Sequence, residues 1–195
     1  GREHARSSHE HGAEDCDQKE NDRKRNQLMI RINKDGLEYF QFETFDPKIC
    51  SQAIFSRKGG ISPDPWSSLN QGGTVGDPRA NVIENRRRAF AALDRPVESI
   101  YDVWQVHGTE VICTRTPRPL DAEHIKADAI VTDNPEITLF MRFADCVPIL
   151  ILDPQKRIVS IIHAGWMGTV NKVITSTINV MKKKFGCNPK DLVSG

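Results

Sequence analysis

Apolar residues form short runs between residues 29 and 195, whereas residues 1–28 are almost entirely polar. Residues 37–42 are rich in aromatic side chains, which favours a β-strand. The runs at 148–152 and 158–162 lack polar alternation, which is typical of strands buried on both faces. Shorter apolar runs predict further strands at residues 53–56, 129–132 and 137–143. Residues 29–195 are therefore predicted to be rich in strands.

Two segments have helical periodicity instead. In residues 80–93, Val82, Ile83, Ala89, Phe90 and Leu93 recur near a 3.6-residue period, which predicts a helix whose Arg86–Arg87–Arg88 run forms a solvated face. Residues 170–185 predict a second helix, with lysines near its C-terminal end and Gly186 as its stop. Many strands with two clear helices indicate an α+β domain with mixed sheets.

Two hairpins are expected from the spacing of these runs. Residues 101–106 and 111–114 flank a Gly-containing turn, so the first hairpin places His107 at its turn. The second joins residues 148–152 to 158–162 through Asp153-Pro154-Gln155-Lys156, a type I turn signal. If Asp153 faces Lys156, Cys146 lies directly opposite His163, close enough for a thiolate and an imidazole to share one ion.

A third ligand completes such a site. Among the remaining histidines after residue 28, His107 is held by predicted strands whereas His124 lies in a polar loop. Two nitrogens and one thiolate suit zinc or copper, and three protein ligands leave room for a water. The structural alternative is that Cys146 is a small buried hydrophobe and that the histidines only satisfy hydrogen bonds. The Gly-containing turn after His163 also predicts an anion-binding helix start.

Composition and charge narrow the function classes. Lys and Arg number 27 against 26 acidic residues, so no broad positive field favours nucleic acid as a partner. No apolar stretch is long enough to cross a membrane, and the first 28 residues contain no signal-peptide core. That polar segment predicts a disordered tail, and Met29 is the expected natural start. Five widely spaced cysteines without a CxxC motif favour a reducing, cytoplasmic location.

Several short motifs, in order, carry a resemblance to a known family. They are Phe55-Ser56-Arg57-Lys58-Gly59-Gly60-Ile61-Ser62, Ser68-Leu69-Asn70, Gly76-Asp77, Asn85-Arg86, Gln105-Val106-His107-Gly108, Ala127-Asp128-Ala129, Ala144-Asp145-Cys146-Val147-Pro148 and His163-Ala164-Gly165-Trp166. From Ala53 to its end, the chain resembles the laccase-domain family of YfiH/YlmD type. This family is also called multicopper polyphenol oxidoreductase-like or purine nucleoside phosphorylase-like.

The resemblance implies a layered α-β-β-α arrangement and a zinc site formed by His107, Cys146 and His163. It also implies phosphorolysis of adenosine, inosine, guanosine and methylthioadenosine, together with adenosine deamination. Nucleoside and phosphate are then the partners. With that activity, His107 and Cys146 belong to the catalytic centre and Asp145 is the expected proton shuttle, with Asp128 as second choice.

The expected substrate contacts lie earlier in the chain. Arg57 is the phosphate candidate, because a guanidinium binds phosphate oxygens bidentately. Asn70 is expected to contact ribose or base, although a turn role explains this residue equally well. The chain departs from the family at Met167, where an Arg is usual. The family's chains also continue past the position of Gly195, so residues 29–195 are expected to be a catalytic domain incomplete at its C-terminus.

Three other functions remain open on the sequence. A copper-dependent polyphenol oxidase agrees with the family's older name, but a multicopper site needs more histidines than the three after residue 28. A cysteine hydrolase would use Cys146 as nucleophile and a neighbouring histidine as base. A non-catalytic interaction module would use the ion only to stabilise its fold.

Overall fold

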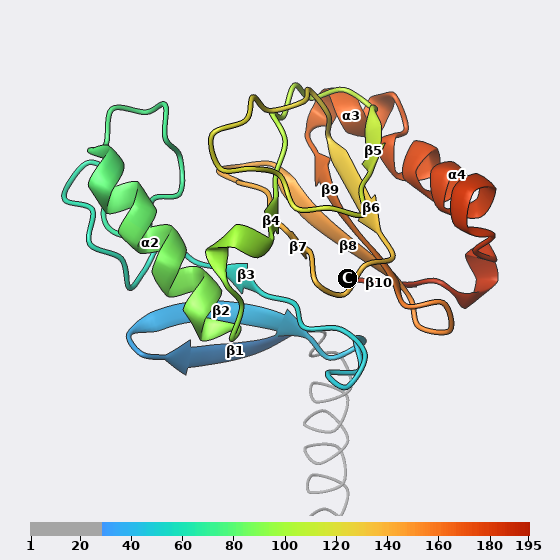
Figure 1. The fold of residues 1–195 in the computed structure, drawn as a ribbon, viewed down its shortest axis with the longest axis horizontal. Coiled ribbons are helices and arrows are strands. Elements are labelled where there is room, and N and C mark those ends of the chain that lie inside the picture. The colour runs from blue at the N-terminus through green and yellow to red at the C-terminus, as the bar shows by residue number, and fades with distance from the viewer. Residues whose placement is uncertain (1–28) are drawn as a thin grey trace, which may run out of the picture.

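The computed structural model describes residues 29–195 (Figure 1). The predicted disordered tail, residues 1–28, lies outside the described residues. The elements follow the chain as β1 (Met29–Lys34), β2 (Leu37–Phe42), β3 (Ile54–Phe55), α2 (Arg79–Ala92), β4 (Ile100–Tyr101), β5 (Val111–Cys113), β6 (Ala129–Thr132), β7 (Thr138–Leu139), β8 (Val147–Asp153), β9 (Ile158–Ala164), α3 (Trp166–Val170), α4 (Val173–Phe185) and β10 (Val193–Ser194), with 3-10 turns at Val97–Ser99 and Pro189–Asp191.

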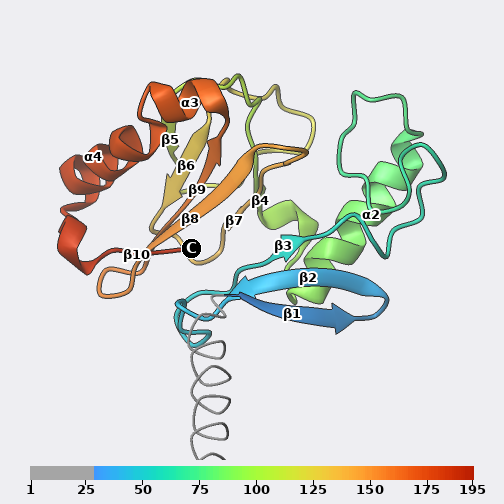
Figure 2. The same cartoon turned by 180° about the vertical axis from the view of Figure 1, so that it is seen from behind.

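A small antiparallel sheet and one helix form the first layer pair. The strand order is β1-β2-β3, and α2 lies across this sheet (Figures 1 and 2). Leu37 and Tyr39 of β2 are buried together with Leu69 and Ala92. The burial of these apolar side chains stabilises the contact between the sheet and the helix.

A mixed five-stranded sheet forms the second layer, in the order β10-β8-β9-β6-β5. Its pairs are antiparallel except β5–β6, which is parallel. Helix α4 covers one face, where Val173, Thr177 and Met181 are fully buried. Val103 and Met141 pack with Ile130 of β6 in a second apolar cluster, distinct from the one under α4. The α+β class with mixed sheets, expected from the sequence, is therefore confirmed.

The end of α4 follows the predicted stop signal. Gly186 adopts φ 66°, a left-handed conformation that glycine reaches without a steric penalty. Its N–H bonds the carbonyl of Lys182, and the N–H of Cys187 bonds that of Met181. The helix begins at Val173, however, because the first predicted turn forms a separate short helix, α3, in which Val170 is 69% exposed.

The predicted hairpin around His107 is wrong. Strand β4 pairs in parallel with β7, and β5 pairs in parallel with β6, so the two flanking runs belong to different sheets. Residues 102–106 form no regular strand apart from an isolated bridge between Trp104 and Lys126. The chain does bend at His107 and Gly108, but each flanking run pairs with a strand that is distant in the sequence.

The β8–β9 hairpin forms, with a register two residues away from the predicted one. Asp153 pairs with Ile158, and His163 pairs with Pro148 instead of Cys146. The connection is longer because Asp153 Oδ1 accepts the backbone N–H groups of Gln155 and Lys156, and Arg157 takes φ 56°. A two-residue shift preserves the face of every side chain, so Cys146 still lies on the His163 side.

The predicted faces of α2 need two corrections, at Ile83 and at Arg86. Ile83, expected in the buried stripe, is 58% exposed. Arg87 and Arg88 do lie on the outer side, where both bond Glu84. Arg86 instead turns inward, with its guanidinium carbon 5.2 Å from the centre of the Phe140 ring. No helix among residues 29–195 has the length and apolar character needed to span a membrane.

Candidate metal centre

The three predicted ligands converge at one edge of the five-stranded sheet. Cys146 immediately precedes β8, and His163 lies near the end of β9, one residue before Ala164. In the antiparallel β8–β9 pair, these two ends meet at the same edge. His107 arrives from the loop between β4 and β5. Segments far apart in the chain thus supply the three donor groups.

The donor atoms are spaced closely enough to share an ion. One imidazole nitrogen from each histidine and Sγ of Cys146 lie within 4.8 Å of one another. A tetrahedral ion bonded at about 2.0–2.3 Å to such atoms holds them about 3.3–3.8 Å apart, so small side-chain movements close the site. The two imidazole rings are 4.8 Å apart and nearly perpendicular. The chemistry and spacing of this donor set fit zinc or copper.

Asp128 holds both histidines in place. It lies opposite His163 across the β6–β9 pair, and its Oδ1 is 2.7 Å from His163 Nδ1. The same carboxylate accepts the backbone N–H groups of Val106, His107 and Gly108 at 3.2, 2.9 and 2.7 Å. A carboxylate on the outer nitrogen of a ligand histidine orients the ring and leaves the other nitrogen for the ion.

The backbone at His107 depends on this carboxylate. His107 has φ 61°, a left-handed conformation that is uncommon for residues other than glycine. Three successive N–H groups around it point at Asp128, forming a concave anion-binding arrangement of the backbone. Because Asp128 is fully buried, its four hydrogen bonds are fixed. The sequence analysis named Asp128 only as the second choice for the proton shuttle. It did not predict that Asp128 would position the two histidines.

The three ligands differ in their exposure to solvent. His163 is 4% exposed, Cys146 is half-buried and His107 is exposed. The ring of the half-buried Phe143 lies 5.7 Å from that of His163. Water and a small molecule can therefore approach from the side of His107.

Exposed apolar residues lie close to the three ligands in the sequence. Val106 and Val147 are the direct chain neighbours of His107 and Cys146, and both are exposed. Trp166, three residues after His163, is 76% exposed. Sequence reasoning missed these residues as site features, because an apolar residue beside a strand end is expected to be buried. Their exposure next to polar ligands is typical of a small-molecule site.

The other predicted site residues lie elsewhere or lack a defined role. Asp145 is exposed next to Cys146 and has no hydrogen bond among the described residues. Arg57 is exposed and donates its Nε to the carbonyl of Ser67. Asn70 uses its amide within the loop, with Nδ2 bonding Gly72 O and Asp77 Oδ2.

Those last contacts belong to a separate buried network. Asp77 also accepts the hydroxyl of Ser62 at 2.6 Å, and Asn85 of α2 donates to Ser62 Oγ. Burial raises the pKa of Asp77, but hydrogen bonds from Ser62, Asn70 and Asn81 outweigh it and hold the pKa below its usual range. The loop that carries Asn70 lies beside α2, away from α3 (Figure 1). The structure therefore does not bring Arg57 or Asn70 into contact with the His–Cys cluster.

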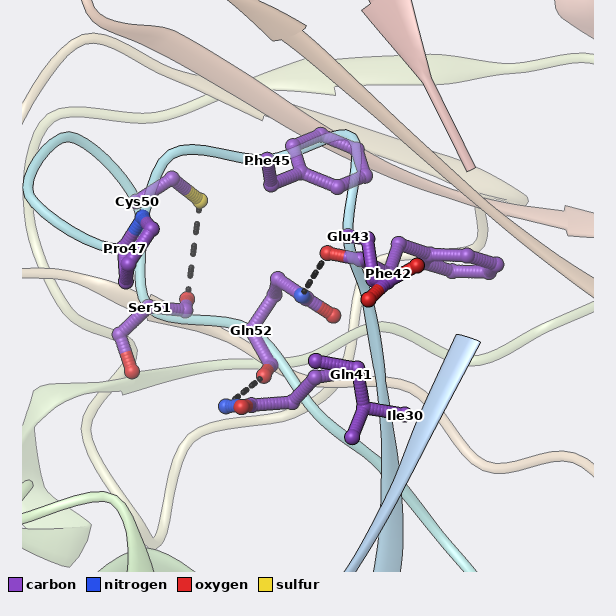
Figure 3. Close-up of a pocket in the computed structure, with 9 residues that line it drawn as sticks. All are labelled: Ile30, Gln41, Phe42, Glu43, Phe45, Pro47, Cys50, Ser51 and Gln52. Carbon is purple, nitrogen blue, oxygen red and sulfur yellow. Dashed lines mark hydrogen bonds between the residues drawn. The ribbon is translucent and has the colours of Figure 1, made fainter. Parts of the chain in front are cut away.

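A surface pocket at the end of β2 is separate from this centre (Figure 3). Its lining includes Phe42, Phe45, Cys50 and Gln52, and contains no predicted site residue. Gln52 crosses it and donates to the carbonyl of Phe42 at 3.1 Å. Burial raises the pKa of the Cys50 thiol, so this cysteine is not an activated nucleophile.

Comparison with known proteins connects the centre to a family. A family model described as multi-copper polyphenol oxidoreductase laccase matches residues 51–195. The purine nucleoside phosphorylase ORF3 of Streptomyces griseus is 39% identical over 144 residues, which are 73% of this chain and 57% of the relative. A purine nucleoside phosphorylase of Deinococcus radiodurans is 36% identical over 138 residues, 71% of this chain and 52% of the relative.

Solved structures agree with this relationship. The crystal structure of YlmD from Geobacillus stearothermophilus superposes with a TM-score of 0.78 at 28% identity, covering 86% of this chain and 63% of that one. The Bacillus licheniformis hypothetical protein YfiH gives 0.74 at 27% identity, covering 87% and 63%. The layered fold implied by the resemblance is thus confirmed. The chain spans about half the length of the curated relatives it matches. It belongs to the multi-copper polyphenol oxidoreductase laccase family, of the YfiH/YlmD type.

Proposed function

We propose that this chain carries the zinc centre of a purine nucleoside phosphorylase. The substrates are adenosine, inosine, guanosine and methylthioadenosine, each cleaved by phosphate, and adenosine is also deaminated. The observation that carries the proposal is the cluster of His107, Cys146 and His163, whose donor atoms lie within 4.8 Å. Relatives named purine nucleoside phosphorylase, at 36–39% identity, support the substrate class.

The ligands are assigned distinct tasks in this proposal. A zinc ion held by the three side chains supplies Lewis-acid chemistry and a readily deprotonated water. His163 is the fixed ligand, because Asp128 and the sheet hold it in the core. His107 borders solvent, so it also faces the substrate. Asp145, exposed beside Cys146, is the proposed proton shuttle.

Substrate positioning is proposed to come from the exposed rim. The ring of Trp166 and the side chain of Val147 offer apolar surface to a purine base beside the ligands. Arg57 and Asn70 remain candidates for phosphate and ribose only if the substrate extends to the segment beside α2. A cytoplasmic location is proposed from the odd number and wide spacing of the cysteines.

The direct test is product analysis. The zinc-loaded protein is incubated with adenosine and phosphate, and adenine, ribose-1-phosphate and inosine are separated by chromatography. We expect all three products, and expect their loss in His163→Gln, which removes the most buried ligand. Asp133→Asn, which alters a surface ion pair with Arg115, is the matched control. Metal-loaded protein that yields no product would sink the purine assignment.

A copper polyphenol oxidase is the second candidate, favoured by the description of the matching family model. Metal analysis of protein purified without added copper separates the two. About one equivalent of zinc supports the phosphorylase, whereas several coppers support the oxidase. A cysteine hydrolase would show inactivation by alkylation of Cys146 and activity that a chelator leaves unchanged.

A further inference from the structure

A cluster of positive charge lies between α2 and the β4–β7 pair, outside the metal centre. At its middle is Asp102, which is 1% exposed and follows β4 directly. Its Oδ1 accepts Arg118 Nε at 2.7 Å, and its Oδ2 is 2.9 Å from His124 Nε2. Arg86 of α2 lies over the ring of Phe140, two residues before Arg142, and the charges of Asp102 and Arg118 act on both arginines. Three guanidinium groups thus lie around one carboxylate, and these four groups together carry a net charge of +2.

Arg118 and Asp102 are hydrogen-bonded to each other, and Asp102 makes no hydrogen bond to Arg86 or Arg142. Arg118 Nη1 donates to the carbonyls of Pro119 and Ala122 at 2.7 and 2.6 Å, so its fork is already engaged. Burial raises the pKa of Asp102, but hydrogen bonds from Arg118 and His124 outweigh it and keep the pKa below its usual range. The single negative charge is therefore present at neutral pH and is already hydrogen-bonded.

Arg86 and Arg142 are the uncompensated members. Within residues 29–195, neither makes an ion pair. Arg86 Nε is buried without a hydrogen-bond partner, although its guanidinium lies over Phe140. Arg142 donates one Nη2 bond, to the carbonyl of Val103 at 3.2 Å. Burial lowers the pKa of both groups, as expected for charges that have lost water without gaining a counter-ion.

The backbone holds these two arginines in place. Gln105 brackets Arg142, because its Nε2 donates to the carbonyl of Arg142 and its Oε1 accepts the N–H of the same residue. Arg86 is fixed by α2, which packs on the same segment through the rings of Phe90 and Phe140, 5.9 Å apart. Both guanidinium groups keep N–H groups without a partner and are partly exposed to solvent, and guanidinium groups bind the oxygens of phosphate and carboxylate anions.

We propose that Arg86 and Arg142 form a binding site for a phosphate group. The net charge of +2 matches a dianion, which favours phosphate over a single carboxylate. The group is either inorganic phosphate or the phosphoryl group of a nucleotide. The site uses none of the metal ligands. It was hidden in the sequence because Arg86 stands in an arginine run that resembles a solvated helix face.

Calorimetric titration of the full chain with sodium phosphate, at ionic strength matched by sodium chloride, tests the site. We expect saturable binding that Arg142→Gln weakens at least tenfold, through loss of charge-assisted hydrogen bonds. Arg87→Gln is the control, because Arg87 is the exposed neighbour of Arg86 and pairs with Glu84. Asp102→Asn removes the compensating charge and should strengthen phosphate binding, a sign that unfolding cannot produce.

Parallel titrations with AMP identify the source of the phosphate. Equal affinities with mutual competition indicate inorganic phosphate, whereas tighter AMP binding indicates a nucleotide. A phosphate bound at the metal centre would be lost in Cys146→Ser and retained in Arg142→Gln, and this pattern overturns the proposal. Absence of saturable binding to the wild-type chain, or equal binding by Arg142→Gln with circular dichroism unchanged, also overturns it. These outcomes are independent of nucleoside turnover.

Discussion

Gly165 gives the sharpest test of the metal centre, because a side chain at this position would collide with two of the three predicted ligands. A Cβ atom at this position would lie 2.7 Å from Cδ2 of His107 and 3.2 Å from Sγ of Cys146. Carbon atoms in contact prefer about 3.5–4.0 Å, so the His107 ring must retreat by roughly 1 Å in Gly165→Ala. Metal–ligand distances tolerate deviations of about 0.2 Å, so the retreat breaks the geometry of the site.

We expect Gly165→Ala to lower zinc affinity by about 10–100-fold, as loss of ligand orientation does elsewhere, which corresponds to about 1.4–2.7 kcal/mol. Overpacking should also reduce the stability of the metal-free protein by about 1–3 kcal/mol. The backbone itself is not the cause, because φ at Gly165 is −75°, which alanine adopts freely. Competition with a chromophoric chelator measures the affinity, and thermal unfolding with and without zinc measures the stability.

Gly73→Ala is the matched control, since a Cβ at Gly73 meets nothing within 4 Å. This variant should bind zinc like the wild type and unfold at nearly the same temperature. If Gly165→Ala bound zinc with unchanged affinity while remaining folded, the ion could not be held where His107 and Cys146 meet. The assignment of the ligands would then be wrong.

Three further outcomes are expected. Asp128→Asn should weaken zinc binding by about 10–100-fold and destabilise the metal-free chain, whereas Asp133→Asn changes neither; a chelator titration that finds equal affinities contradicts the positioning role. Burial and the neighbouring Asp153 raise the pKa of Cys187 to about 11, so its thiol should resist alkylation at pH 8, which peptide mapping checks. The stability that the neutral thiol contributes is fully present below about pH 9 and should be lost as the pH rises toward 11, which alkaline unfolding curves check. Met181 is a fully buried residue of α4, so Met181→Ala should lower the free energy of unfolding by about 2–5 kcal/mol; a loss below about 1 kcal/mol in denaturant unfolding would mean that α4 does not pack tightly on the sheet.

Elements with a strong local pattern were predictable from the sequence. Strands β2 and β6 begin and end at the predicted residues, and α2 is displaced by one residue. The stop of α4 at Gly186 followed from backbone chemistry alone. Strand β1 was missed because Met29–Lys34 alternates apolar and charged residues only weakly. Its pairing with β2 supplies the stability that its own sequence does not indicate.

Long-range pairing could not be predicted in the same way. The turn at Gly108 suggested a local hairpin, but β5 instead pairs with β6 and forms an edge strand of the five-stranded sheet. The error of two residues at β8–β9 arose from Asp153, whose side chain caps a longer loop than the turn signal implied. The His107–Cys146–His163 cluster was nevertheless predicted, since an even register error leaves faces unchanged.

The roles of two charged residues required the fold. Asp128 carries no sequence signal that distinguishes a proton shuttle from a hydrogen-bond acceptor for three backbone groups. Arg86 differs from Arg87 only by its angle around α2, and one position along the helix separates an exposed side chain from one that turns inward and is partly buried.

The place of β9 in the sheet sets the moment at which the ion can be captured during synthesis. This strand lies between β8 and β6, so a nascent chain that ends before residue 158 has two edges facing each other with no middle strand. Until His163 has left the ribosome, only two donors exist and Asp128 lacks its imidazole partner. The proposed ion can therefore meet all three ligands only after β9 has been inserted between its neighbours, so complete metal loading follows that step of folding.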